Sequence, residues 1–232
     1  MGGYLKRRDW INISMILLLL VISYYKYQNR AFTVNQAQIY MDTLIEITVT
    51  SRDKAIDKKI EHVWNMIQEY ELKFSYHDHR SVLFNINSKE SPHDIDNDFF
   101  EILTMAKKVY HESNHSYDVS IGRLIDIWDF ENETMPDSID IYEALNYIGF
   151  DNVTFDSEKL FMPYRYKLNL GSIAKGYVID KVIEYFIEQE VVEVSINAGG
   201  DMRFYSEKKK KNCFLLLGRR RYSISGLTGE RR

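Results

Sequence analysis

The chain has 232 residues and a formal net charge of −4, and 45% of its residues are hydrophobic and 28% charged. This length can bury a core as one sizeable domain or two small ones. The slightly acidic balance gives no electrostatic case for a nucleic-acid partner, which normally meets a clustered basic surface. The single cysteine, Cys213, excludes an internal disulfide and any multi-cysteine metal cluster.

The N-terminus predicts a membrane segment. Lys6, Arg7 and Arg8 precede an apolar run, Trp10–Tyr27, which has no polar face through Met15–Ile22. The fully apolar part is shorter than the roughly 20 residues of a spanning helix, but aromatic residues at both ends extend it into the interface. A cleaved signal peptide and an uncleaved anchor both fit this pattern. No A-x-A-like site and no lipidation cysteine follows the run, which favours a single-pass anchor in the cell membrane. The basic flank then places the rest of the chain outside the cytoplasm.

Hydrophobic periodicity predicts strands and helices after a short polar spacer. Alternation with β-branched residues predicts a strand over Ala37–Thr50, and an amphipathic stripe predicts a helix over Ile56–Phe74. The polar stretch Ser75–Ser91 predicts a long loop, and a second helix is expected at Phe99–Tyr110. Tyr117–Phe130 is compatible with a short strand and one helical turn.

The second half continues this mixture. Asp137 or Ser138 can cap a short helix that runs through Tyr147. A long helix is predicted from Ser172 to Gln189, followed by a strand at 191–197. Short β segments are predicted at 152–155, 160–162 and 167–170. With no repeat and no internal linker, the pattern predicts an α+β fold of mixed α/β layers.

The C-terminus departs from this pattern. Four lysines, Lys208–Lys211, lead into a segment in which no helix or strand period continues and arginine replaces lysine. One interpretation of residues 207–232 is a disordered basic tail. The interpretation that we favour is a slip of the reading frame at the adenine-rich lysine codons, so that this segment is not native. Independent resequencing of the locus distinguishes the two.

The segment Lys167–Asp180 predicts an anion-binding helix start. We expect a strand to end before Gly171, which turns the chain, and Ser172 to cap the helix, so that free N–H groups and the positive helix end meet at one place. Lys175 in the first turn opposes the helix dipole, and a phosphate there would explain it. Gly176 costs about 1 kcal/mol relative to alanine in a helix, which a closely packed ligand would explain. The alternative is a plain strand–turn–helix with an exposed lysine.

Two other clusters are weaker candidates. Gly199 and Gly200 permit close backbone approach to a ligand, with Asp201 able to orient a hydroxyl or a metal-bound water, although a plain turn also fits. His77 and His79 lie in a polar loop, where histidines are usually solvated. The sequence contains neither a G-x-x-x-x-G-K-[ST] phosphate loop nor a G-x-G-x-x-G fingerprint.

Taken together with Met41–Thr43, Tyr117–Gly122 and Leu124–Phe130, these segments resemble the ApbE family in consistent order from Ala37 to Tyr205. The resemblance implies an ApbE-like fold, with a basic flank and anchor at 1–30 and an incomplete flavin-transferase domain at 31–206. It implies FAD:protein FMN transfer, in which a Mg²⁺-dependent enzyme splits FAD and attaches FMN to a threonine or serine of an acceptor protein.

The resemblance also implies roles for particular residues. Met41 would contact the flavin, and Tyr76 would lie against the isoalloxazine. Ile127, Trp128 and Asp129 match a segment whose backbone holds FAD.

At the predicted helix start, Asn169 stands in place of an FAD-binding aspartate, Lys175 in place of an FAD-contacting residue, and Ser172 in place of a Mg²⁺ ligand. A serine hydroxyl with carboxylates suits this hard cation. The aspartate and threonine that complete the metal site in the family have no counterpart after Tyr205, and Thr228 lies in the tail. The sequence also departs from the family pattern by Asp42, Asp129 and Asn169, and by Arg123 in place of a proline.

The leading hypothesis is therefore a transferase anchored outside the membrane, acting on an acceptor flavoprotein of a membrane redox system. Mg²⁺ and a lysine would neutralise charge on the transferred phosphoryl group while AMP leaves. The alternatives are a non-catalytic FAD-binding protein and an inactive fragment.

Overall fold

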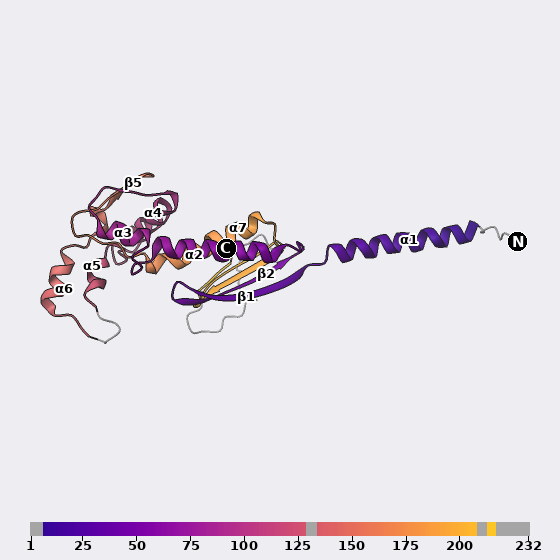
Figure 1. Cartoon of the computed structure of the whole chain (residues 1–232), viewed down its shortest axis with the longest axis horizontal. Coiled ribbons are helices and arrows are strands. Elements are labelled where there is room, and N and C mark those ends of the chain that lie inside the picture. Colours follow the sequence, from indigo (N-terminus) through magenta and orange to yellow (C-terminus); the bar gives the residue numbers. More distant parts are fainter. Residues whose placement is uncertain (1–6, 129–133, 208–212, 217–232) are drawn as a thin grey trace, which may run out of the picture.

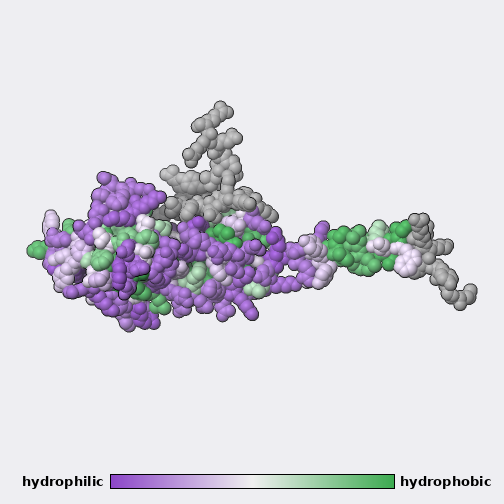
Figure 2. Space-filling model, turned by 90° about the horizontal axis from the view of Figure 1, so that it is seen from above, coloured by the Kyte–Doolittle hydropathy of each residue, from purple (hydrophilic) through white to green (hydrophobic). Residues whose placement is uncertain are grey.

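The computed structural model describes residues 7–128, 134–207 and 213–216. Helix α1 (Arg7–Gln28) projects from one end of an elongated domain, and a lobe of short elements lies at the other end (Figure 1). The predicted apolar helix is confirmed: Trp10–Gln28 is long and apolar enough to cross a membrane, and none of it is buried. Figure 2 shows it as a hydrophobic rod beside a largely hydrophilic domain. A membrane anchor and a signal sequence share these properties.

The main sheet has five strands in the described residues, in the order β1-β2-β6-β7-β8 with every neighbouring pair antiparallel. The expected single strand over Ala37–Thr50 is wrong, because the chain reverses within it. A two-residue turn at Met41 and Asp42, with φ of 52° and 58°, joins two strands. Positive φ at both positions matches the tight hairpin turns that follow strand twist. The strands are β1 (Phe32–Tyr40), β2 (Thr43–Ser51), β6 (Glu193–Ala198), β7 (Asp201–Ser206) and β8 (Cys213–Leu216).

Strand β8 lies where no strand was expected. Cys213 pairs with Phe204, and the sheet continues to Leu216. Residues 208–212 and 217–232, including the four lysines and Thr228, lie outside the described part of the chain.

Helices α2 (Ile56–Phe74) and α7 (Gly171–Glu188) pack against the sheet and each other. The predicted bounds of α2 are confirmed, and its apolar stripe belongs to the same buried core as the inward-facing side chains of β2 and β6. Helix α4 (Asn97–Glu112) packs on α7 and confirms the second predicted helix. The core members on these elements include Ile47, Val49, Ile60, Val63, Ile67, Ile102, Ile183, Phe186 and Ile196, each at most 1% exposed.

A polar network fixes the three helices relative to one another. The Tyr177 hydroxyl on α7 lies 2.9 Å from both Asp98 and Glu101 of α4 and shares its proton between them. Lys73 at the end of α2 pairs with Asp98 and, at 2.7 Å, with Asp96. The far end of α2 is thereby held beside the first half of α7.

The lobe contains the short elements. They are α3 (Val82–Ser88), β3 (His93–Asp94), α5 (Gly122–Asp126), α6 (Ser138–Leu145), a 3₁₀ turn (Phe150–Asn152), β4 (Thr154–Phe155) and β5 (Lys159–Phe161). The strands form a small antiparallel sheet in the order β3-β5-β4.

Three local expectations are corrected in this lobe. The stretch expected as a loop contains α3, which Ser81 caps by accepting from the Phe84 amide at 2.9 Å. Residues 167–170 do not form a strand, since they contribute only one parallel bridge, from Lys167 to Ile121. Helix α6 begins after Asp137 as expected, but the Asp137 side chain makes no capping hydrogen bond.

Candidate functional site

A cavity of about 1120 Å³ lies at the end of the main sheet away from α1. This volume is comparable to the roughly 300–1,000 Å³ of typical small-molecule sites. Its walls come from the β1–β2 turn, the end of α2, the loop 75–80 and the start of α7. Four predicted residues line it together: Met41, Tyr76, Asn169 and Lys175.

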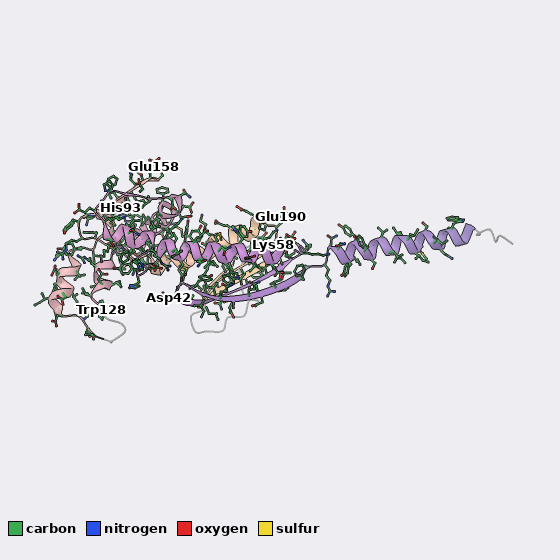
Figure 3. The ribbon with its side chains drawn as sticks, viewed as in Figure 1. Asp42, Lys58, His93, Trp128, Glu158 and Glu190 are labelled. Atoms are coloured by element: carbon green, nitrogen blue, oxygen red, sulfur yellow. The ribbon has the colours of Figure 1, made fainter. Side chains whose placement is uncertain are left out.

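The other predicted residues lie apart from the lining of this cavity. Ser172 is exposed on the first turn of α7. Ile127 lines a separate depression of about 200 Å³ near α6. Trp128 is half-buried at the lobe (Figure 3), and Asp129 lies outside the described residues.

The hairpin turn forms one wall. The Met41 amide donates to Glu71 Oε1 at 2.6 Å, which ties the turn to the last part of α2. Both turn residues have positive φ, a region in which Asp is tolerated better than most side chains. The backbone geometry therefore explains why glycine suits the position of Asp42.

Hydrogen bonds to α5 of the lobe fix the side chain of Tyr76 in the cavity lining. Its hydroxyl lies 2.7 Å from the Gly122 carbonyl and 2.6 Å from Asp126 Oδ1, and shares its proton between them. Burial and this carboxylate raise the pKa of Tyr76 above its ordinary value, so the phenol stays protonated. Lys167 also pairs with Asp126, at 2.6 Å.

Gly122, the first residue of α5, packs directly against the backbone of Lys167. A Cβ on Gly122 would lie 2.7 Å from Lys167 Cβ and 2.8 Å from Lys167 O, closer than real contacts allow. Asn87 of α3 binds the same segment, since its side chain donates to the Leu168 carbonyl and accepts from the Leu168 amide, both at 2.8 Å. These contacts fix the segment that leads to Asn169.

The start of α7 differs from its predicted form. The helix begins at Gly171, and Ser172 lies within its first turn instead of capping it. The Ser172 hydroxyl donates to Tyr117 Oη at 3.1 Å. Asn169 Oδ1 accepts from the Gly171 amide at 2.9 Å, so the side chain expected to meet a ligand satisfies the helix start.

The start of α7 therefore offers fewer free amide groups to an anion than the sequence predicted. The Ile173 and Ala174 amides bond to the Leu170 carbonyl, at 3.0 and 2.8 Å. With the Gly171 amide also occupied, the Ser172 amide is left without a hydrogen bond to any described residue.

Lys175 is half-buried beside the cavity and makes no salt bridge with a residue in the described part of the chain. No atom lies within 4 Å of a Cβ built on Gly176, so no protein group accounts for this glycine. A lysine of the cavity lining that makes no salt bridge to a described residue fits an anionic ligand at this wall.

The charged groups around the cavity are mixed. Arg80 pairs with Asp78 at 2.7 Å, and its hydrogen bond lowers the pKa of Asp78 to about 2. Asp42 and Glu71 bring further carboxylates to the same walls. The residues that sequence reasoning missed are Glu71, Asn87 and Asp126, which position the walls through contacts distant in sequence.

The second glycine cluster has a structural role. Gly199 and Gly200 adopt φ of 64° and 106° in the β6–β7 turn, as expected for a turn. A Cβ on Gly199 would lie 2.3 Å from Thr43 Oγ1. The close backbone approach made by Gly199 is therefore to the β1–β2 hairpin, and Asp201 is the exposed first residue of β7.

The described residues do not supply a complete Mg²⁺ site. Within them, no group of three or more His, Cys, Asp or Glu side chains is placed to hold a metal. His77 and His79 are therefore not part of such a group. The hydrogen-bond partner of the Ser172 hydroxyl is a tyrosine. A hard cation requires several oxygen ligands and favours carboxylates, so this donor set does not fit Mg²⁺ by itself.

Comparison with known proteins identifies the relatives of this arrangement. The model of the ApbE family matches residues 41–216. The chain is 26% identical over 186 residues to the FAD:protein FMN transferase of Klebsiella pneumoniae (strain 342), covering 77% of the chain and 57% of the relative. It is 28% identical over 170 residues to that of Haemophilus influenzae, covering 68% of the chain and 47% of the relative. The chain thus spans about half the length of the curated relatives it matches.

Solved structures show the same fold. The ApbE protein from Thermotoga maritima superposes with a TM-score of 0.69 at 26% identity, covering 75% of this chain and 59% of that one. The flavin transferase ApbE from Vibrio cholerae gives a TM-score of 0.68 at 20% identity, with the same coverage.

Proposed function

Because the chain belongs to the ApbE family, we propose that its activity is FAD:protein FMN transfer to a hydroxyl of an acceptor protein. The observation that carries the proposal is the cavity into which Met41, Tyr76, Asn169 and Lys175 converge from separate segments. Its size suits a dinucleotide, and Lys175, which has no salt-bridge partner in the described part of the chain, lies in the first turns of α7. The names of the relatives supply the reaction class.

We assign the flavin end to the wall formed by Met41 and Tyr76. Met41 offers an adaptable thioether to an aromatic ring system, and such contacts are favourable. Tyr76 presents a ring whose hydroxyl is already occupied by Gly122 and Asp126. The ring is therefore free to lie against the isoalloxazine without leaving a polar group unsatisfied. Backbone groups of Ile127, Trp128 and Asp129 would extend this contact.

We assign the diphosphate to the α7 wall. Lys175 and Asn169 line this wall, and the amide of Ser172 lies at the start of the same helix, just outside the lining; all three can donate to phosphate oxygens. Asn169 contributes through the helix start that it holds, and it adds no negative charge beside the phosphates. Charge-assisted hydrogen bonds of this kind are roughly twice as strong as neutral ones.

The proposed transfer forms a bond between the acceptor oxygen and the phosphorus of the FMN half. The bond from that phosphorus to the bridging oxygen breaks, and AMP leaves with the bridging oxygen. The hydroxyl proton passes to solvent. In such reactions the protein contributes mainly positioning and charge neutralisation, which is the role we give to Lys175.

The family resemblance also implies Mg²⁺, with Ser172 as one ligand. The described oxygen donors do not complete that site, so the steps above use only groups of the chain. Metal dependence is tested directly by running the transfer assay with Mg²⁺ and with a chelator.

We further propose that α1 anchors the domain outside the cytoplasmic membrane and that the acceptor is a flavoprotein of a membrane redox system. The proposed segments are a flank and anchor at 1–30, a flavin-transferase domain at 31–206, and a segment at 207–232 whose reading frame resequencing tests. Strand β8 of this last segment extends the sheet of the domain.

Incubation of the full chain in detergent with FAD, Mg²⁺ and a threonine-containing acceptor peptide tests the function. Covalent flavin fluorescence on the peptide supports transfer. Saturable FAD binding without labelling supports the alternative of a non-catalytic FAD-binding protein. Aggregation without binding supports an inactive fragment.

A further inference from the structure

A second cavity, of about 390 Å³, lies at the opposite end of the domain, where α1 meets the base of the sheet. We call it the basal cleft. Its lining is Tyr27, Gln28, Arg30, Ala31, Phe32, Arg52 and Lys54. Three of these seven residues are cationic and none is acidic. The basal cleft thus differs from the cavity of about 1120 Å³ at the other end of the sheet, which has mixed charges and which we call the flavin-site cavity.

The three cations of the basal cleft make no strong ion pair with the described residues. Within the described residues Arg30 makes no salt bridge. Lys54 donates to Gln28 Oε1 at 3.2 Å, a neutral partner, and it forms no salt bridge with the residues that the structure describes. Arg52 pairs with Glu207 at 3.3 Å, but both side chains are about half exposed, and such pairs contribute little.

The nearest carboxylate in sequence is turned to other partners. Asp53 pairs with Lys59 at 2.8 Å and accepts from the Ala55 amide at 2.9 Å. These bonds lower the pKa of Asp53, and they hold it at the start of α2. The positive charge of the basal cleft is therefore not neutralised from this side.

The position of the basal cleft indicates its ligand. The cleft directly follows the apolar helix, whose last turns expose Tyr24 and Tyr25, at 64% and 70%. Tyrosines are enriched at the level of lipid headgroups. With the basic flank on the cytoplasmic side, cations beside the outer end of the helix run against the usual charge asymmetry of membrane proteins. A local anionic partner at headgroup level accounts for them.

We propose that the basal cleft binds the phosphate of an anionic phospholipid headgroup in the leaflet that α1 enters. Arg30, Arg52 and Lys54 would surround the phosphate, and Phe32 would lie toward the acyl region. The inference rests on the proposed anchoring by α1, which supplies the lipid, and it is independent of flavin transfer.

The consequence is a fixed distance between the membrane and the flavin-site cavity. Strand β1 runs nine residues from the basal cleft to the turn at Met41, about 30 Å at 3.3 Å per residue. Helix α2 spans the same interval with 19 residues, also about 30 Å. Figure 3 shows Lys58 and Glu190 on the α1 side of the domain and Asp42 toward the lobe. Two attachments, the helix and the headgroup, would hold this axis upright and set the height at which an acceptor is modified.

Native mass spectrometry of the full chain tests the site. The protein is released from micelles that contain equal amounts of phosphatidylglycerol and phosphatidylcholine. We expect the wild type to retain phosphatidylglycerol at least about tenfold over phosphatidylcholine, since each cation near an anionic surface contributes about fivefold. The triple variant Arg30→Gln/Arg52→Gln/Lys54→Gln should lose this preference.

A charge-matched variant, Lys89→Gln/Lys108→Gln/Lys159→Gln, changes cations of the lobe and α4 and should retain the preference. Equal retention of both lipids by the wild type, or an unchanged preference in the basal variant, would overturn the site. Displacement of phosphatidylglycerol by excess inorganic phosphate would also overturn it, because it would indicate a free-phosphate site.

Carbonate extraction of membranes separates failure of the site from failure of the anchor. The wild type and both variants should stay in the membrane pellet. Release of the wild type would refute anchoring and the headgroup site together, without bearing on flavin transfer in detergent. Retention in the pellet without lipid selectivity would refute the headgroup site alone. Matching circular dichroism spectra of the variants show that the fold is kept.

Discussion

At the end of the sheet away from α1, the β1–β2 turn, the end of α2 and the start of α7 surround a large cavity with acidic, basic and aromatic side chains. At the end beside α1, the same strands present a smaller cleft in which every charged residue is a cation. The two ends share β1, β2 and α2, about 30 Å long. The framework therefore separates the groups suited to a nucleotide from those suited to a membrane surface. Changes at one end should leave the other unaffected, and this separation can be tested.

The largest expected effect is on stability, at the contact between Gly122 and Lys167 that fixes the segment leading to Asn169. Gly122→Ala places a methyl group against the Lys167 backbone, at 2.8 Å from its carbonyl oxygen. We expect a loss of about 3 kcal/mol in the free energy of unfolding, the upper range for overpacking. Urea denaturation of the full chain in detergent, followed by tryptophan fluorescence, measures it.

Gly176→Ala is the matched control for this change. No atom lies within 4 Å of the added methyl group, so the helix should gain up to about 1 kcal/mol. If both variants unfold like the wild type, the close packing of Gly122 against Lys167 is refuted.

The second effect concerns ligand binding at the cavity. Lys175→Ala should weaken FAD binding by about tenfold to a hundredfold, since hydrogen bonds to charged groups contribute about 1.5–3 kcal/mol. His77→Ala, which removes another residue of the cavity lining, should change it much less. Titration by quenching of flavin fluorescence measures both.

The basal variant Arg30→Gln/Arg52→Gln/Lys54→Gln extends this experiment to the other end. It should bind FAD as the wild type does. Equal titration curves for Lys175→Ala and His77→Ala would refute the diphosphate assignment, and weak FAD binding by the basal variant would refute the separation of the two ends.

A smaller effect is expected at the turn that reaches the cavity. Asp42 has a φ of 58°, a conformation that costs non-glycine residues about 1–2 kcal/mol. Asp42→Gly should stabilise the protein by about 0.5–1 kcal/mol after the entropy cost of glycine. The same substitution at Asp57, in the first turn of α2, should instead destabilise it by up to about 1 kcal/mol. A loss of stability in Asp42→Gly would mean that the carboxylate makes a contact more valuable than the strain it bears.

The sequence predicted elements whose stability depends on local periodicity. The bounds of α2 follow from a stripe of apolar residues at three- and four-residue spacing, which becomes the buried face. The hairpin was missed because Ile39 and Met41 continue the alternation up to the turn. The signal lay in the step from Met41 to Leu44, which breaks the period of two beside an aspartate suited to positive φ.

The candidate site was predicted in part, for a related reason. Motifs singled out Met41, Tyr76, Asn169 and Lys175, which line one cavity in the structure, but they did not indicate the contacts that hold these residues there. Glu71 binds the turn 30 positions away, and Asn87 binds Leu168 across 81 positions. No periodicity encodes such pairs, because each depends on how the lobe packs against the sheet.

The last and smallest effect tests the ion pair that joins α4 to α7. Glu101 accepts from Lys181 at 2.7 Å and from Tyr177 at 2.9 Å, and the Lys181 bond is the main cause of a pKa below the ordinary value of 4.5. Because the folded-state pKa is lowered, this stability is present above pH 4.5 and is lost as the pH falls through the lower folded value. Lys181→Met should therefore cost about 0.5 kcal/mol at pH 7, a modest figure because the Glu101 side chain is 38% exposed. The gap to the wild type should narrow as the pH falls below 4.5 in urea denaturation. Lys108→Met, at a more exposed pair with Glu112, should show little difference at either pH. A gap for Lys181→Met that stays constant with pH would mean that Lys181 acts through packing, and the orientation of α7 beside α4 would then depend on apolar contacts and Tyr177.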